Sequence, residues 1–209
     1  MKLTKLFSVA GVVATIGATA LIQSAAADSK KLEVRPFVYD PGKTHIIVSK
    51  WVKNLGLNDN NGKKNNKGLL LSKTGPTATN AEAGADIRGV KGMTLTELGF
   101  DFRDGSHCSG GAPRFNVVTV EDPTTTHVIG SCTNGTVTPE TPEAGWSRVR
   151  FDPTSAANAF PPIPAGQHVL QMNIAFDEGT DTAGGTPGMA VIDNIDINGT
   201  LIGSGTSDN

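Results

Sequence analysis

Hydrophobic residues in this chain alternate with polar residues over short stretches. After residue 27, no segment repeats them with a helical period over three turns. Alternation with a period of two, in runs rich in Val, Ile, Thr and Phe, is typical of β-strands. The pattern predicts strands near residues 33–39, 45–53, 68–73, 85–90, 94–103, 114–120, 126–132, 146–151, 168–176 and 189–197. Because 25 Gly and 12 Pro residues are available for turns, the chain is predicted to be an all-β sandwich or barrel.

The only two cysteines are Cys132, the last residue of the most clearly defined hairpin (predicted at residues 114–132), and Cys108, six residues before that hairpin. The expected strand pairing places Cys132 opposite Arg114, close to the bend that carries Cys108. An even cysteine count outside the cytoplasm indicates a disulfide. The alternative is a reactive thiol at Cys108 activated by His107. It is disfavoured because neighbouring residues of an extended chain point in opposite directions.

Alternation also divides each predicted strand into an inward and an outward face. The outward residues of several strands are charged or carry amides: Glu97, Asp101, Arg103, Arg114, Asn116, Arg148, Arg150, Gln171 and Asn173. If these strands share one sheet, their outer surface can hydrogen-bond a polyhydroxylated ligand. The predicted ligand-binding residues are Asp101, Arg103, Arg114, Asn116, Arg148, Arg150 and Gln171. The alternative is a solvated face crossed by ion pairs.

Asp193 breaks the alternation of the strand at 189–197. With a strict period of two, it falls on the same side as Val191, Ile195 and Ile197. A carboxylate among apolar neighbours is costly unless it is paired, hydrogen-bonded or bound to a cation. Two interpretations are therefore open: Asp193 is a calcium ligand, or it accepts backbone N–H hydrogen bonds at the end of a sheet.

The first 27 residues have the layout of a secretory signal peptide. Lys2 and Lys5 precede an apolar run, and small residues at 25–27 fit a peptidase site. A membrane anchor is the competing interpretation, but Gly, Ser and Thr dilute the run. We therefore expect cleavage after Ala27, a single domain over residues 28–203 and a frayed tail at 204–209. The mature protein is expected to be extracellular or periplasmic, with no membrane span.

Charge and motifs exclude several classes of function. The formal net charge is −2 and no basic run extends beyond Lys63-Lys64, so a nucleic-acid partner is not expected. The sequence contains no GxSxG, HExxH or phosphate-binding Gly-Lys-Ser/Thr motif.

The polar stretch 54–68 is predicted to be an exposed, mobile loop.

Two segments resemble a known type of domain. The ending VIDNIDING, residues 191–199, resembles the last strand of galactose-binding-like jelly-roll domains, including many carbohydrate-binding modules. Residues 95–117 are similar to a motif of secreted bacterial proteins. The resemblance implies a two-sheet antiparallel β-sandwich of jelly-roll type, with Asp193 as a structural calcium ligand. A flat aromatic platform is not expected, because residues 28–209 hold only Trp51, Trp146 and Tyr39 besides phenylalanines.

Three functional hypotheses follow. The first is a non-catalytic protein that binds a glycan or another polar cell-surface component. The second is a structural or adhesive protein of the cell envelope, and the third is a hydrolase that acts on glycans. A shallow groove would favour binding, and a flat face crossed by ion pairs would favour the structural role. A deep pocket of convergent carboxylates with perturbed pKa values would favour the hydrolase.

Overall fold

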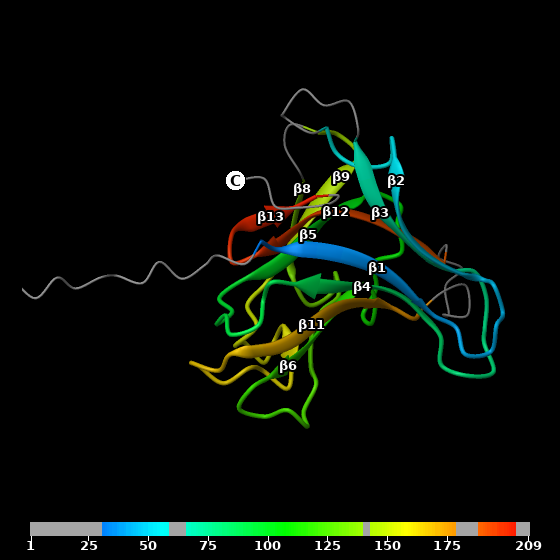
Figure 1. Cartoon of the computed structure of the whole chain (residues 1–209). Helices are drawn as coiled ribbons and strands as arrows, with labels where there is room; N and C mark the ends of the chain where they lie inside the picture. The colour runs from blue at the N-terminus through cyan, green and yellow to red at the C-terminus, as the bar shows by residue number, and fades with distance from the viewer. Residues whose placement is uncertain (1–30, 59–65, 140–142, 179–187, 204–209) are drawn as a thin grey trace, which may run out of the picture.

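The protein is an antiparallel β-sandwich (Figure 1). One disulfide links two of its loop segments. The computed structural model describes residues 31–58, 66–139, 143–178 and 188–203, and no helix occurs among them. Sheet A has the order β1 (Glu33–Tyr39), β4 (Glu82–Arg88), β11 (Val169–Phe176), β6 (Arg114–Thr119), β7 (His127–Gly130) and β10 (Ala159–Phe160). Sheet B has the order β2 (Ile47–Lys53), β3 (Lys67–Lys73), β12 (Met189–Ile197), β5 (Leu98–Arg103), β9 (Trp146–Phe151) and β8 (Thr136–Pro139), and β13 (Thr200–Ile202) pairs with β12.

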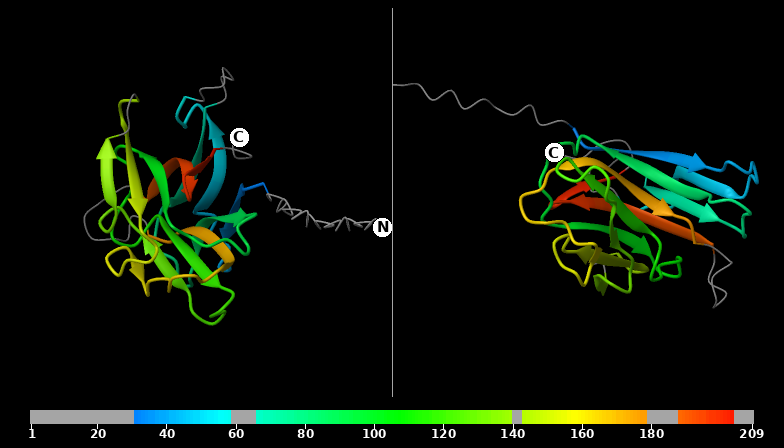
Figure 2. Two further views of the ribbon diagram at one scale, coloured as in Figure 1. Left: turned by 90° about the vertical axis from the view of Figure 1, so that its left-hand side faces the viewer. Right: turned by 90° about the horizontal axis from the view of Figure 1, so that it is seen from below.

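The central strands have jelly-roll topology, as expected. Along the chain, β3, β5, β9 and β12 belong to sheet B, whereas β4, β6, β7 and β11 belong to sheet A. The resulting spatial orders, β3-β12-β5-β9 and β4-β11-β6-β7, are those of two interlocked Greek keys. Figure 2 shows the two sheets from two further directions. Because the chain repeatedly crosses between the sheets, strands that follow one another in sequence often have outer faces on opposite sides of the molecule.

Aromatic and aliphatic side chains from both sheets fill the space between them. Phe100 and Phe151 of sheet B contact Phe115 of sheet A, with ring centroids 6.0 and 6.3 Å from that of Phe115. All three rings are buried, as are Ile174 and Ile192. Burial of each large apolar side chain contributes about 1.5–3 kcal/mol relative to exposure. Apart from β12 and the start of β11, where bulges shift the pattern, the inward faces predicted from alternation form the core.

Most strand predictions are confirmed, and β1, β9 and β12 have the predicted bounds. Strand β4 begins at Glu82, three residues before the predicted start. The segment Ala83-Gly84-Ala85 has low β-propensity, but it is paired on both sides, by β1 and by β11. Strands β8, β10 and β13 were not predicted. They have two to four residues each, too few for alternation to be visible, and pairing with a neighbouring strand defines them.

The hairpin of β6 and β7 forms, but its predicted register is wrong. Arg114 pairs with Gly130 and not with Cys132. The backbone φ angles are 115° at Gly130 and 84° at Ser131, so the chain turns out of the strand before it reaches Cys132. At the other end, Val120 donates its N–H to the carbonyl of His168, which lengthens the turn.

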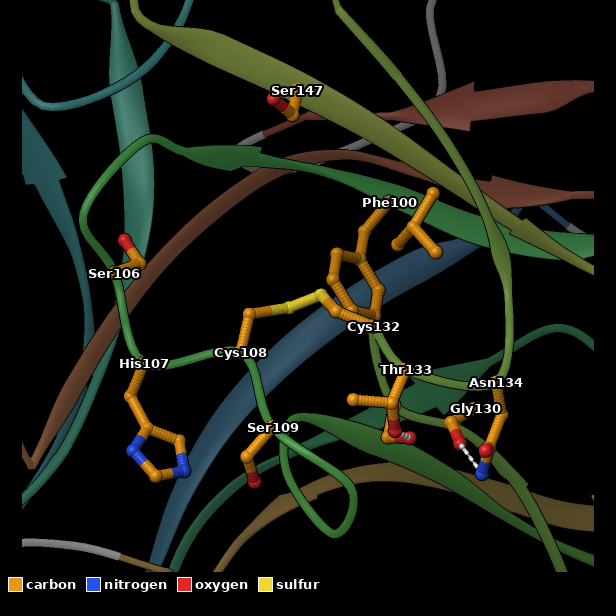
Figure 3. Close-up of a disulfide and its surroundings, with 12 residues drawn as sticks. Phe100, Ser106, His107, Cys108, Ser109, Gly130, Cys132, Thr133, Asn134 and Ser147 are labelled. Atoms are coloured by element: carbon orange, nitrogen blue, oxygen red, sulfur yellow. Dashed lines mark hydrogen bonds between the residues drawn. A yellow bond between two sulfur atoms is a disulfide. The ribbon is translucent and has the colours of Figure 1, made fainter. Parts of the chain in front are cut away.

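The predicted disulfide is confirmed, and it joins the loop after β5 to the segment after β7 (Figure 3). The Cα atoms of Cys108 and Cys132 are 5.3 Å apart, and both residues pack against the core beside Phe100. The reactive-thiol alternative is therefore excluded. Figure 3 also shows the His107 ring pointing away from the disulfide.

Several predictions lie wholly or partly outside the described residues: the signal peptide at 1–27, the tail at 204–209 and the centre of the stretch at 54–68. The start of that stretch is not exposed as predicted, because Leu57 is buried against Trp146 and Val191 on the outer side of sheet B. In the part of the chain that the structure describes, no helix is long and apolar enough to cross a membrane.

Candidate functional site

The predicted ligand-binding residues do not form one surface. Four of them, Asp101, Arg103, Arg148 and Arg150, belong to β5 and β9 of sheet B. The other three, Arg114, Asn116 and Gln171, belong to β6 and β11 of sheet A. The condition that these strands share a sheet is therefore not met, and the two groups must be considered separately.

On sheet B, the charged residues neutralise one another. Asp101 is fully buried and accepts hydrogen bonds from Arg148 Nε at 2.8 Å and Nη2 at 3.0 Å. Arg150 Nη1 lies 3.6 Å from the same carboxylate, and its Nε pairs with Asp196 at 2.8 Å. Arg150 can reach across β5 because that position is Gly99, where a Cβ would overlap the arginine side chain. Asp101, Arg148 and Arg150 therefore form a structural ion-pair network with Asp196, whereas Arg103 is exposed.

Asp193 lies on the same outer face, beside this network. Strand β12 contains a bulge between Asp193 and Asp196, with Asn194 at a φ of 44°. The bulge places Ile195 in the core and Asp193 on the other face, so the strict period-two prediction for this strand is wrong. Asp193 is 3% exposed and accepts the backbone N–H groups of Leu57 and Asn194 at 2.9 and 2.8 Å.

The surroundings of Asp193 fit a hydrogen-bonded carboxylate better than a calcium ligand. Its two backbone neighbours present N–H donors, whereas calcium requires oxygen ligands. Among the residues that the structure describes, no group of three or more His, Cys, Asp or Glu side chains is arranged to hold a metal ion. Calcium at Asp193 remains a prediction to be tested.

On sheet A, strand pairing aligns one residue from each of the six strands across the outer face. This cross-strand row consists of Arg35, Asp86, Asn173, Asn116, Val128 and Phe160. The residues that precede them in β4, β6 and β10, such as Ala85, Phe115 and Ala159, are fully buried in the core. The row therefore faces away from the core, with two amides at its centre and the exposed ring of Phe160 at one edge.

The outer face of sheet A is hollowed along this row. One depression of about 170 Å³ is lined by Asp86, Asn116, Gln171 and Asn173, among others. A second of about 350 Å³ shares Asp86 and Gln171 with the first and extends to Lys91. The buried Asn173 Oδ1 accepts no hydrogen bond within the described part of the chain. A buried acceptor without a donor is unfavourable, and this oxygen is covered from solvent, so a surface ligand reaches other atoms of the depression instead.

A larger cavity of about 790 Å³ opens at the end of the same sheet. We call it the edge cavity. It is lined by Tyr39, Lys73, Thr77, Thr79, Asn80, Ala81, Glu82, Arg114, Asp177 and Glu178. Arg114 joins the cavity to the cross-strand row, because its Nε donates to Asn116 Oδ1 at 3.3 Å. Arg114 thus lies between the cavity and the row, although the two hollows have no lining residue in common and the ring of Phe37 covers Gly84 between them on β4.

Arg114 and Asp177 form a two-pronged ion pair in the wall of the edge cavity. Nη1 and Nη2 of Arg114 donate to the two carboxylate oxygens of Asp177 at 2.6 and 2.8 Å. Burial raises the pKa of Asp177, but the hydrogen bonds and charge of Arg114 outweigh that effect and leave the pKa below its usual range. The hydrogen bonds that Arg114 donates to Asp177 in turn raise the pKa of Arg114. This pair stays charged at neutral pH.

Glu178 is held by the loop that the disulfide fixes. Its Oε2 lies 3.0 Å from His107 Nε2 and accepts a short hydrogen bond from Ser109 Oγ. The buried His107 ring packs edge-on against Phe176, with ring centroids 5.3 Å apart. A Cβ at Gly111 would overlap the Glu178 carboxylate, so the glycine allows the acid to lie over the loop.

Glu82 differs from the other two acids. Partial burial, and then the nearby charge of Asp177, raise the pKa of its carboxyl group. Within the described residues, it takes part in no hydrogen bond or ion pair. It pairs across the sheet with Tyr39, whose side chain is 52% exposed. Glu82 and Tyr39 are thus available to a ligand in the edge cavity.

Sequence reasoning identified only part of this surface. Arg114, Asn116 and Gln171 were predicted, whereas the acids of the edge cavity were missed. Asp177 and Glu178 directly follow the strand predicted at 168–176, and two adjacent acids at a strand end were a signal that could have marked them. Glu82 was missed because β4 begins earlier than its weak β-propensity indicates.

The chain matches no protein-family model, and comparisons with curated proteins and with solved structures find no significantly similar chain.

Proposed function

We propose that the protein is a secreted, non-catalytic binding domain that holds a glycan against the outer face of sheet A. The observation that carries this proposal is the cross-strand row, whose hollowed centre is lined by the amide residues Asn116, Gln171 and Asn173. Amides both donate and accept hydrogen bonds, which suits the hydroxyl groups of sugars. The resemblance to carbohydrate-binding jelly rolls agrees with this proposal but does not carry it.

The shape of the surface supports an extended ligand. The row crosses six strands, a distance of about 24 Å at about 4.8 Å per neighbouring strand. Phe160, at one edge, is 55% exposed and can stack on the apolar face of a sugar ring. A chain of several sugar units could therefore lie across the sheet, with stacking at one end and hydrogen bonds at the centre.

The hydrolase is less well supported, although the edge cavity contains carboxyl groups whose pKa values are shifted in opposite directions, as in acid and base pairs. Both oxygens of Asp177 are occupied by Arg114, so this carboxylate is poorly placed to act as a nucleophile or a base. The structural hypothesis fits the ion-paired outer face of sheet B, but not the hollowed face of sheet A.

A glycan array on the mature protein, followed by calorimetry on the best ligand, tests the proposal. The double variant Gln171→Ala/Asn173→Ala should weaken binding at least about tenfold, the loss of about 1.4 kcal/mol expected for one or two hydrogen bonds. Arg103→Ala is the matched control, because Arg103 is exposed on the opposite sheet. A ligand lost with Arg103→Ala and kept by the double variant would move the site to sheet B. An array without any ligand would reject glycan binding.

A further inference from the structure

The cations of the edge cavity are directed at protein acceptors and not at the cavity space. Arg114 donates to both oxygens of Asp177, to the carbonyl of Gly111 and to Asn116. Lys73 is only 7% exposed, and its Nζ donates to the backbone carbonyl of Asp177 at 2.8 Å. Most of their hydrogen-bonding capacity is thus used inside the protein.

The carboxylates of the cavity have fewer hydrogen-bond partners within the protein than the cations do. Asp177 and Glu178 accept hydrogen bonds, whereas Glu82 accepts none within the described residues and interacts with Arg114 only through charge. Three carboxylates face two cations in the lining, which leaves an excess of negative charge. The nearby Tyr39 ring adds an exposed aromatic wall on the same face of the sheet.

A free carboxylate beside an aromatic ring is suited to a primary ammonium group. The ammonium forms short charge-assisted hydrogen bonds with the carboxylate and is attracted to the face of the ring. Metal ions are a less suitable occupant, because the described acids are not arranged as a metal-binding group. The volume, about 790 Å³, is within the range of small-ligand sites.

We propose that the edge cavity binds the ammonium group of an unacetylated amino sugar, with Glu82 as its counter-ion and Tyr39 as its aromatic wall. This inference rests on the proposed glycan binding, because Arg114 connects the cavity to the cross-strand row through Asn116. Glu82 lies four residues along β4 from Asp86 of the row, roughly 13 Å, so a glycan that contacts both sites must run along the strands as well as across them. The protein then distinguishes glucosamine-type chains from their acetylated or neutral counterparts.

Calorimetry with three oligosaccharides of equal length, made of glucosamine, N-acetylglucosamine or glucose, tests this inference at a pH where the amine is protonated. The wild type should bind the glucosamine oligomer at least about tenfold more tightly than the other two. Glu82→Gln should abolish that preference, and Tyr39→Ala should reduce it. Glu97→Gln is the matched control, since this partly exposed acid lies outside the cavity.

The possible outcomes separate this inference from the proposed function. Equal binding of all three oligomers by the wild type and by Glu82→Gln would overturn the ammonium site and leave glycan binding intact. Binding of none of them, together with an empty array, would reject glycan binding itself. Tighter binding of a lysine-containing peptide, lost in Glu82→Gln, would show that the ammonium comes from protein and not from sugar. Melting curves confirm that each variant is folded.

Discussion

Single residues show how strongly the environment of a charge depends on the tertiary structure. Asp101 has the outward position that alternation predicts, yet it is fully buried, because Arg148, Arg150 and Asn194 cover its carboxylate. Taking a carboxylate out of water is tolerable only when donors replace the water. The prediction of a solvated or ligand-binding Asp101 is therefore replaced by a structural role.

Removal of this carboxylate should be strongly destabilising. Asp101→Ala leaves Arg148 and Arg150 without their shared partner in a partly buried site, so we expect a loss of about 3 kcal/mol in the free energy of unfolding. Urea denaturation measures the effect. Arg103→Ala, on the same strand but exposed, should change stability by less than about 0.5 kcal/mol. Equal losses in both variants would argue against the network.

Asp193 allows the calcium prediction to be tested by metal removal. Because two backbone N–H groups already donate to it, Asp193→Ala should lower stability by about 1–3 kcal/mol, and a chelator should leave the melting temperature of the wild type unchanged. Calorimetric melting with chelator and with millimolar calcium checks both statements. If calcium instead raises the free energy of unfolding as mass action requires, by about 2.7 kcal/mol at a free concentration of a hundred times the dissociation constant, calcium would be assigned to this site.

At the scale of elements, the loop between β5 and β6 carries out two tasks. Its disulfide ties it to the segment after β7, and its His107 and Ser109 hold Glu178 at the wall of the edge cavity. The loop has little secondary structure of its own, so the covalent link limits the conformations from which these side chains reach the acid.

The disulfide should contribute measurably to stability. It closes a loop with a sequence separation of 24 residues, for which the chain-entropy model gives about 3 kcal/mol. We expect the double variant Cys108→Ser/Cys132→Ser to unfold at a lower temperature and lower urea concentration by this amount. A reducing agent should destabilise the wild type and have no effect on the double variant. Equal stability of the two proteins would show that the disulfide does not stabilise the fold by restricting the unfolded chain.

At the scale of the whole molecule, jelly-roll topology determines which residues can act together. Strands β5 and β6 follow one another in sequence, but they lie in different sheets. Alternation alone assigned their polar residues to one surface, whereas the fold places them on opposite sides. Among the described residues, the part on sheet A lines two depressions, and a cavity opens at the end of the same sheet.

The proposed glycan binding outside the cell requires export of the chain. We expect the mature protein to begin at Asp28, because the small residues before it fit a signal peptidase. Intact-mass analysis of protein from a secreting host checks this expectation. An intact leader on protein extracted from membranes would support the membrane-anchor interpretation instead.

The sequence by itself determined the all-β class, most strand positions, the inward faces and the disulfide. These features depend on local alternation or on the presence of only two cysteines, so they can be recognised without knowing which strands are neighbours. Only the tertiary structure decided the sheet to which each strand belongs, the burial of Asp101 and the bulge at Asp193. It also brought Glu82 of β4 beside Asp177, which follows β11. All of these features depend on pairing between strands that are distant in sequence, and this pairing cannot be predicted from a local sequence pattern.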